Sequence, residues 1–208
     1  MGAGVSLSPI FFNFMKTIQK TITVNKLEIF TDETANSPRK TQETLGFFLV
    51  KDEKHFSPDE HPELKEIMIS CGDAAEDVED HIALMKKAIK EQKLTISDIF
   101  PITKHEHGNI NYSLGTTKGF DYSNNGFYFV EKDRAKLLSA TTKKEKKEII
   151  ESELKEYNQW VKNGIYAFIL YKNSGEEEES MSGFYEIEDI RAYLPKSWKK
   201  EDLNKYFK

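Results

Sequence analysis

The segment from 101 to 134 reads PITKHEHGNINYSLGTTKGFDYSNNGFYFVEKDR, and the rest of the chain is organised around it. Two histidines, His105 and His107, precede a run of small and polar residues between 108 and 126. The segment then continues into three consecutive aromatic residues at 127–129. Because polar, glycine-rich sequence does not form a packed core by itself, we expect regular elements on both sides to hold it. The pattern predicts that this segment is the binding region.

Alternating apolar and polar residues predict strands on both sides of the segment. Residues 21–31 and 94–103 alternate with a period of two, which is typical of half-buried strands. Residues 45–50, LGFFLV, form a short apolar run that predicts a central strand covered on both faces. Inside the segment, residues 110–114 alternate, and residues 126–130 are expected to pair back on them as a hairpin.

Capping residues and apolar stripes predict the two main helices. Asp73 with Glu76 resembles a capping box at the start of the first helix. Thr142 and Glu145 form a capping box for the second helix, and Gly164 is expected to end it. Apolar residues at steps of three and four follow each cap. These stripes are Ala75, Val78, Ile82, Met85 and Ile89 in the first helix, and Ile150, Leu154, Tyr157 and Val161 in the second.

The order of these elements predicts the fold class. Strands outnumber helices and do not alternate regularly with them, so neighbouring strands can pair through turns. Residues 165–171 and 180–187, joined by an acidic turn, are expected to form an antiparallel hairpin. The class is therefore α+β, with a mostly antiparallel sheet and two main amphipathic helices packed on it. We expect a single domain over residues 21–208, preceded by an ill-ordered extension at residues 1–20.

Composition narrows the function classes. The chain has 208 residues and a formal net charge of -5, which argues against direct nucleic-acid binding because such binding needs a basic face. No apolar run is long enough to span a bilayer, so no membrane partner is expected. The single cysteine, Cys71, excludes an internal disulfide and fits a reducing cytoplasm, here that of a host cell. No cofactor is expected.

Two arrangements were weighed as sites of chemistry. His105 and His107, at i and i+2 on an extended strand, face one side, and Asp121 could complete a two-histidine, one-carboxylate metal site. The favoured interpretation is that these polar residues bond to their own backbone. Cys71 precedes the expected first helix, which would lower its pKa and favour a nucleophile. Free cysteines are more often small core residues, however, and no catalytic residue is assigned.

Nucleotide binding is a further alternative. Five aromatic residues lie near three asparagines, and together these side chains could stack on a base and read its edge. They are Tyr112, Phe120, Tyr122, Phe127 and Tyr128, with Asn111, Asn124 and Asn125. No glycine-rich phosphate loop precedes a helix, and aromatic residues in hairpins mostly form cross-strand pairs. The cross-strand interpretation is therefore preferred.

The order of segments resembles that of a group of poorly characterised proteins from phages, plasmids and other mobile elements. The patches that carry the resemblance are an Asn-X-Pro-Arg loop running into Leu-Gly, a His-Ser-Gly turn followed by Trp-Asp-Ser-Gly, and Tyr-Gly-Phe followed by Asp-Ser-Cys-Trp-Gly-Phe-Tyr. In this chain Phe120 replaces the tryptophan of the second patch, the serine after His107 is missing, and Met181-Ser182 replaces the Cys-Trp pair. The corresponding patches are 36–39 with 45–46, 106–108 with 120–123, and 165–168 with 179–185.

The resemblance implies a mobile-element accessory protein, the setting in which inhibitors of bacterial defence occur. The leading hypothesis is a non-enzymatic, anti-CRISPR-like protein that inhibits a host defence effector, such as a nucleic-acid-guided nuclease, by protein–protein contact. Loops rich in Tyr, Asn, Ser and Gly suit adaptable interfaces, and acidic residues could occupy the basic channel of a nuclease. The expected binding residues are His105, His107, Asn111, Tyr112, Asp121, Tyr122, Asn124, Asn125, Glu176, Glu177, Glu178 and Glu179.

Two other functions remain open. One is a metal-dependent enzyme, or a protein that binds and sequesters a nucleotide, which would use a pocket formed by His105, His107 and Asp121. The other is a structural or assembly protein.

Overall fold

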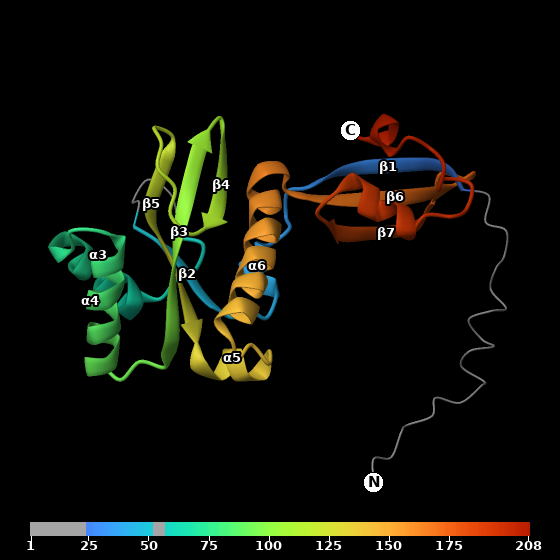
Figure 1. The fold of residues 1–208 in the computed structure, drawn as a ribbon. Coiled ribbons are helices and arrows are strands. Elements are labelled where there is room, and N and C mark those ends of the chain that lie inside the picture. Colours follow the sequence, from blue (N-terminus) through green and yellow to red (C-terminus); the bar gives the residue numbers. More distant parts are fainter. Residues whose placement is uncertain (1–23, 52–56) are drawn as a thin grey trace, which may run out of the picture. The chain divides into compact units, whose positions relative to one another are not determined.

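The computed structural model describes residues 24–51 and 57–208, whose helices and strands are drawn in Figure 1. The extension predicted at residues 1–20 lies outside the described residues. None of the helices in the described ranges is long and apolar enough to cross a membrane. The elements in chain order are β1 (Val24–Asp32), α2 (Pro38–Thr41), β2 (Gly46–Val50), α3 (Pro62–Ala74), α4 (Val78–Glu91), β3 (Ile96–His107), β4 (Asn109–Leu114), β5 (Tyr122–Glu131), α5 (Lys132–Leu137), α6 (Lys143–Asn163), β6 (Ile165–Lys172), β7 (Glu177–Phe184), η1 (Ile187–Ala192) and η2 (Leu203–Tyr206).

The chain divides into two compact units. The central unit is Glu33–Ile165, and the terminal unit joins the segment that ends at Asp32 to Tyr166–Lys208. The α+β class with antiparallel sheets is confirmed. Where a single domain over residues 21–208 was expected, the structure has a separate sheet and a separate core in each unit. The reason is that β1 joins the sheet of the C-terminal segment, so the terminal unit is discontinuous in sequence.

The central unit is a sheet covered by helices on both faces. Its four strands lie in the order β2-β5-β3-β4. Successive side chains of a strand point to opposite faces, and in β5 Phe127 and Phe129 pack with residues of α3 and α4, whereas Tyr128 and Val130 pack with residues of α6. Figure 1 shows α3 and α4 on one side of this sheet and α6 on the other.

The structure corrects two predictions about these strands. β2 was expected to be central, but it lies at an edge of the sheet. It is nevertheless covered on both faces, because Phe48 belongs to the core under α6 and Leu49 to the core under α3 and α4. The hairpin predicted between residues 110–114 and 126–130 is wrong. β4 pairs with β3, and β5 pairs with the other side of β3.

The reversal between β3 and β4 depends on a glycine. His107 pairs with Asn109, so the chain turns within Gly108, whose φ of 78° is in the left-handed region that glycine adopts without steric cost. The longer connection at residues 115–121 then carries the chain from β4 to β5 on the far side of β3.

A helix that the sequence analysis did not predict, α3, covers part of the sheet. Pro62 lies in its first turn, where a proline is a favourable helix start. The ring Nδ1 of His61 caps the helix by accepting the Leu64 backbone N–H at 3.3 Å. Three side chains at steps of three and one are buried beneath it: Leu64, Ile67 and Met68.

The start of the next helix, α4, was also misplaced. Its cap is Asp77, whose side chain accepts the Asp80 N–H at 2.8 Å, and Asp73 lies inside α3 instead. Cys71 therefore does not precede a helix but is part of α3, where partial burial raises its pKa. The expectation of a lowered pKa at Cys71 is wrong.

The second predicted helix, α6, begins and ends where expected. Thr142 and Glu145 form the complete capping box, and Gly164, with a φ of 71°, follows the last turn. The predicted hairpin in the terminal unit is likewise confirmed, because β6 and β7 pair antiparallel in a sheet of order β1-β6-β7. The core of that unit includes residues of β1, β6, η1 and η2.

Candidate functional site

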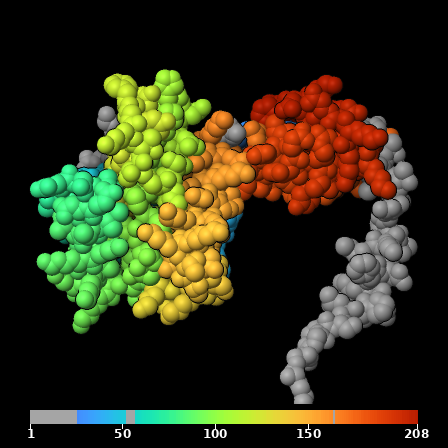
Figure 2. Space-filling view, in the orientation of Figure 1, coloured from blue at the N-terminus to red at the C-terminus, as the bar shows by residue number. Residues whose placement is uncertain are grey.

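A surface groove of about 580 Å³ lies in the central unit, between the outer edge of β4 and α6. We refer to it as the β4–α6 groove. In Figure 2 the green surface of the sheet adjoins the orange surface of α6. The lining residues come from the β3–β4 hairpin and from one face of the helix: His105, His107, Asn109, Ile110, Asn111, Tyr112, Ser113, Glu151, Leu154, Lys155, Asn158, Gln159 and Lys162.

Helical periodicity explains the wall formed by α6. Residues three and four positions apart lie on one face of a helix, and Glu151, Leu154, Asn158 and Lys162 follow this spacing, with Lys155 alongside. Ile150, Leu154 and Tyr157 form a stripe that is buried against the sheet. The helix face next to this stripe therefore lies along the edge of the sheet. The groove wall is therefore the boundary of the apolar stripe, where polar side chains border the core.

Asn158 joins the two walls. Its Oδ1 accepts the backbone N–H of Tyr112 at 2.7 Å, and its Nδ2 donates to the Tyr112 carbonyl, also at 2.7 Å. A primary amide carries the same donor and acceptor as a peptide group. The side chain of Asn158 thus bonds to the edge of β4 as the backbone of a neighbouring strand would.

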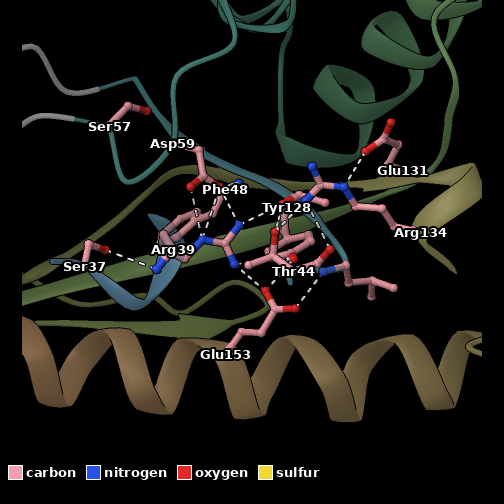
Figure 3. A network of polar contacts seen from close by, with 12 residues as sticks. Ser37, Arg39, Thr44, Phe48, Ser57, Asp59, Tyr128, Glu131, Arg134 and Glu153 are labelled. Carbon is pink, nitrogen blue, oxygen red and sulfur yellow. Dashed lines mark hydrogen bonds and ion pairs between the residues drawn. The ribbon is translucent and has the colours of Figure 1, made fainter. Parts of the chain in front are cut away.

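A buried polar network, shown in Figure 3, holds α6 against the sheet at β2. The Arg39 side chain, only 2% exposed, forms ion pairs with Asp59 and Glu153, and it donates to the carbonyl of Gly46 at 2.8 Å. Glu153 also accepts the backbone N–H of Leu45 at 2.7 Å. The network connects α2, the segment before α3, β2 and α6.

Electrostatics keep this network charged. Burial by itself opposes the charge on Arg39, but the hydrogen bond and charge of Asp59, together with Tyr128 and Glu153, raise its pKa overall. Burial raises the pKa of the Tyr128 hydroxyl, and this group donates to Glu153. Arg39 therefore stays protonated and Tyr128 stays neutral at physiological pH, which makes the network a fixed support for α6.

The network continues to α5 through a second arginine. Arg134 donates to the Thr44 hydroxyl at 2.8 Å and pairs with Glu131 at 2.7 Å. These arginines were not among the predicted site residues, because an arginine in a polar stretch of sequence carries no local signal of burial. The polar residues of α6 at the groove were missed for a similar reason, since they lie in a helix face that reads as solvated.

The structure brings several of the predicted binding residues together at the tip of the β3–β4 hairpin. His105, His107, Asn111 and Tyr112 all line the β4–α6 groove, and His105 and Asn111 are cross-strand partners. The Tyr122 ring stacks on His105 with centroids 4.6 Å apart. This arrangement agrees with the expected cross-strand aromatic pairing. Tyr112, however, is buried in the core and presents little surface.

Asp121 lies beside His107 rather than converging with both histidines. The Nδ1 atom of His107 lies 3.2 Å from the Asp121 carboxylate, and the ring centroids of His105 and His107 are 6.5 Å apart. Within residues 24–51 and 57–208, no group of three or more His, Cys, Asp or Glu side chains converges as a metal-binding cluster.

Other predicted binding residues have internal partners. The Asn124 amide accepts from the Thr103 hydroxyl at 2.6 Å and from the Thr117 N–H at 3.1 Å, and it donates to the Thr117 carbonyl. Asn124 therefore supports the connection at residues 115–121. The neighbouring Asn125 is partly buried, and its backbone carbonyl accepts the Lys51 N–H at 2.9 Å. Its side-chain Oδ1, in contrast, is buried without a hydrogen-bond partner among the described residues.

The predicted acidic residues 176–179 belong to the terminal unit, whereas the histidine residues belong to the central unit. Glu178 pairs with Lys172 at 3.0 Å, and Glu176, Glu177 and Glu179 are exposed. The predicted binding residues therefore form two surfaces, one on each unit.

One of the aromatic residues considered for base stacking, Phe120, stands out beside the first surface. Phe120 is fully exposed in the connection between β4 and β5, close in sequence to Tyr122, which is 40% exposed. We call Phe120, Tyr122, His105 and His107 the aromatic tip. The sequence signal of Phe120 is an aromatic residue between a glycine and an aspartate, outside any alternating strand pattern.

Comparison with models of protein families, with curated proteins and with solved structures finds no match to this chain. The resemblance to mobile-element proteins stays a prediction.

Proposed function

We propose that this chain is a non-enzymatic binding protein of a phage or other mobile element that inhibits a host defence effector by protein–protein contact. The class of partner, a nucleic-acid-guided nuclease in the cytoplasm of the host cell, follows from the resemblance described above. The mode of action follows from the surface of the central unit.

The observation that carries the proposal is the exposure of Phe120 within the aromatic tip. Aromatic side chains dominate the energetics of protein interfaces, because they bury a large area and lose few rotamers. The connection that presents Phe120 is held by the hydrogen bonds of Asn124 to Thr103 and Thr117. A presented aromatic residue on a supported turn lowers the entropy cost of association.

The acidic surface of the terminal unit supports the same proposal. Glu176, Glu177 and Glu179 are exposed next to one another at the β6–β7 turn. Complementary charge accelerates encounter and selects among partners, and its effect falls with ionic strength. A basic nucleic-acid channel is the complementary surface.

The first prediction concerns capture of a partner. The tagged chain, incubated with a bacterial lysate, is expected to retain a specific protein that mass spectrometry identifies. Phe120→Ala is expected to weaken its affinity by roughly 30-fold, the loss of an interface anchor of about 2 kcal/mol. Reversal of Glu176, Glu177 and Glu179 to lysine is expected to slow association and reduce its dependence on salt.

The matched control is Leu137→Ala, which truncates another exposed apolar side chain of the same unit, on α5. Its affinity for the captured protein should equal that of the original chain. Equal capture by Phe120→Ala, with association kinetics unchanged by the charge reversal, would contradict the proposal. Turnover of a small molecule that depends on His105 or His107 would also contradict it.

A further inference from the structure

We propose that the β4–α6 groove binds an extended, acidic peptide segment of a partner protein, which pairs with β4 as an additional strand after displacing the side chain of Asn158. The inference rests on the proposed function, because it assigns a part of the partner to a particular surface. It concerns a different surface from Phe120, so the two can fail separately.

The position of β4 in the sheet is the first argument. Among the described strands β4 is the last in its sheet, with β3 as its neighbour. The bonds of Tyr112 to Asn158 show that the N–H and C=O of this residue point away from β3. Backbone groups of alternate residues point to the same edge of a strand. Those of Ile110 and Leu114 are therefore directed to the groove side as well.

Asn158 is the second argument, because it already places an amide on this edge. A peptide strand would offer the same donor and acceptor at the same position, so displacement exchanges one pair of hydrogen bonds for another. Such an exchange has a small net hydrogen-bond energy. The adjacent groups of Ile110 and Leu114 then provide further bonds that Asn158 does not make.

The lining of the groove defines the chemistry of the segment. Ile110, which is partly exposed, provides apolar surface beneath the strand position, next to the buried Tyr112 and Leu154. Lys155 and Lys162 lie on the helical wall together with one carboxylate, that of Glu151. Neither lysine forms an ion pair with another described residue, so the wall carries a net positive charge. An extended segment with apolar side chains at alternate positions and carboxylates facing α6 satisfies both features. At about 3.3 Å per residue, pairing along all of β4 involves a segment roughly 20 Å long.

The sharpest variant is Ile110→Pro, which removes the N–H directed to the groove and leaves the ladder to β3 intact. Proline is tolerated on edge strands where its missing N–H faces outward. Ile110→Ala is the matched control, since it removes the same apolar side chain but keeps the N–H. Asn158→Ala removes the internal competitor for the edge.

The experiment selects a displayed library of random peptides on the full chain, with Ile110→Pro protein present in solution as the competitor. We expect enrichment of acidic peptides that alternate apolar residues. Synthetic copies should bind Ile110→Pro about tenfold more weakly than Ile110→Ala, since a backbone bond is lost. Compared with the original chain, the peptides should bind Asn158→Ala several-fold more tightly. They should bind the double variant Lys155→Glu, Lys162→Glu more weakly, because its wall repels carboxylates.

A measurement on the unaltered chain does not depend on how these variants fold. Adding a selected peptide should slow hydrogen exchange at the Ile110 and Leu114 amides. The inference is overturned if no peptide distinguishes Ile110→Ala from Ile110→Pro, or if exchange at these amides does not change. It is also overturned if Asn158→Ala forms dimers without binding peptide, because a second copy would then occupy the edge. Partner capture that still depends on Phe120 would leave the proposed function intact.

Discussion

Arg39 shows how one side chain supports the architecture of the central unit. It satisfies two carboxylates, those of Asp59 and Glu153, at a place where Tyr128 is also buried. The two acids in turn accept backbone N–H groups, Phe48 to Asp59 and Leu45 to Glu153. Removing the guanidinium would leave two partly buried carboxylates without their cation, which is costly in a medium of low dielectric constant.

We therefore predict that Arg39→Met lowers the free energy of unfolding by about 3–5 kcal/mol, the range for breaking a buried ion pair. Urea denaturation followed by circular dichroism measures the change. Lys40→Met is the control, because the neighbouring lysine is exposed and its replacement should cost less than about 0.5 kcal/mol. Equal stability of the two variants would show that the network contributes nothing to the fold.

At the scale of elements, α6 carries both the support and the groove. Glu153 bonds to the network at Arg39, and Asn158, farther along the helix, bonds to β4. Its start is defined by Thr142, whose hydroxyl accepts the Glu145 N–H at 3.2 Å, while the Glu145 carboxylate accepts the Thr142 N–H at 2.8 Å. These bonds also lower the pKa of Glu145, which favours the ionised form at neutral pH.

Thr142→Ala is expected to destabilise the central unit by about 1 kcal/mol, because alanine lacks the hydroxyl that accepts the Glu145 N–H. Thr142→Ser retains the hydroxyl, so its free energy of unfolding should lie within about 0.3 kcal/mol of that of the original chain. Thermal unfolding of the three proteins provides the comparison. A loss as large with serine as with alanine would mean that the threonine methyl group, not the cap, is responsible.

At the scale of the whole molecule, each unit has its own core and one of the two tryptophans of the chain. Trp160 packs against the core under α6, and Trp198 packs against the core of the terminal unit. Small units bury a smaller fraction of their surface and are less stable. The terminal unit is therefore expected to unfold before the central unit.

Trp160→Phe and Trp198→Phe leave one fluorescent reporter each. We predict a lower denaturant midpoint for the Trp198 signal than for the Trp160 signal. Leu203→Ala, at a fully buried position of the terminal core, should lower the Trp198 midpoint by an amount corresponding to about 2–5 kcal/mol and leave the Trp160 midpoint unchanged. Coincident transitions that Leu203→Ala shifts together would show that the two units unfold as one.

The sequence by itself determined the features that depend on residues close in the chain. The capping box of Thr142 and Glu145, the end of α6 at Gly164 and the β6–β7 hairpin all arise from contacts over a few positions. The start of α3 was not predicted, although Pro62 lies in its first turn. The contact of His105 with Tyr122 depends on the pairing of β3 with β5, which the structure has in place of the hairpin predicted between residues 110–114 and 126–130.

Only the tertiary structure decided which strands are neighbours. β5 lies inside the sheet and β2 at its edge, although alternate residues of both strands fill the two cores. The burial of Arg39 and the contact of Asn158 with Tyr112 join residues far apart in sequence. Such pairings depend on competition among all elements for buried surface and hydrogen-bond partners, and no local pattern records the outcome of that competition.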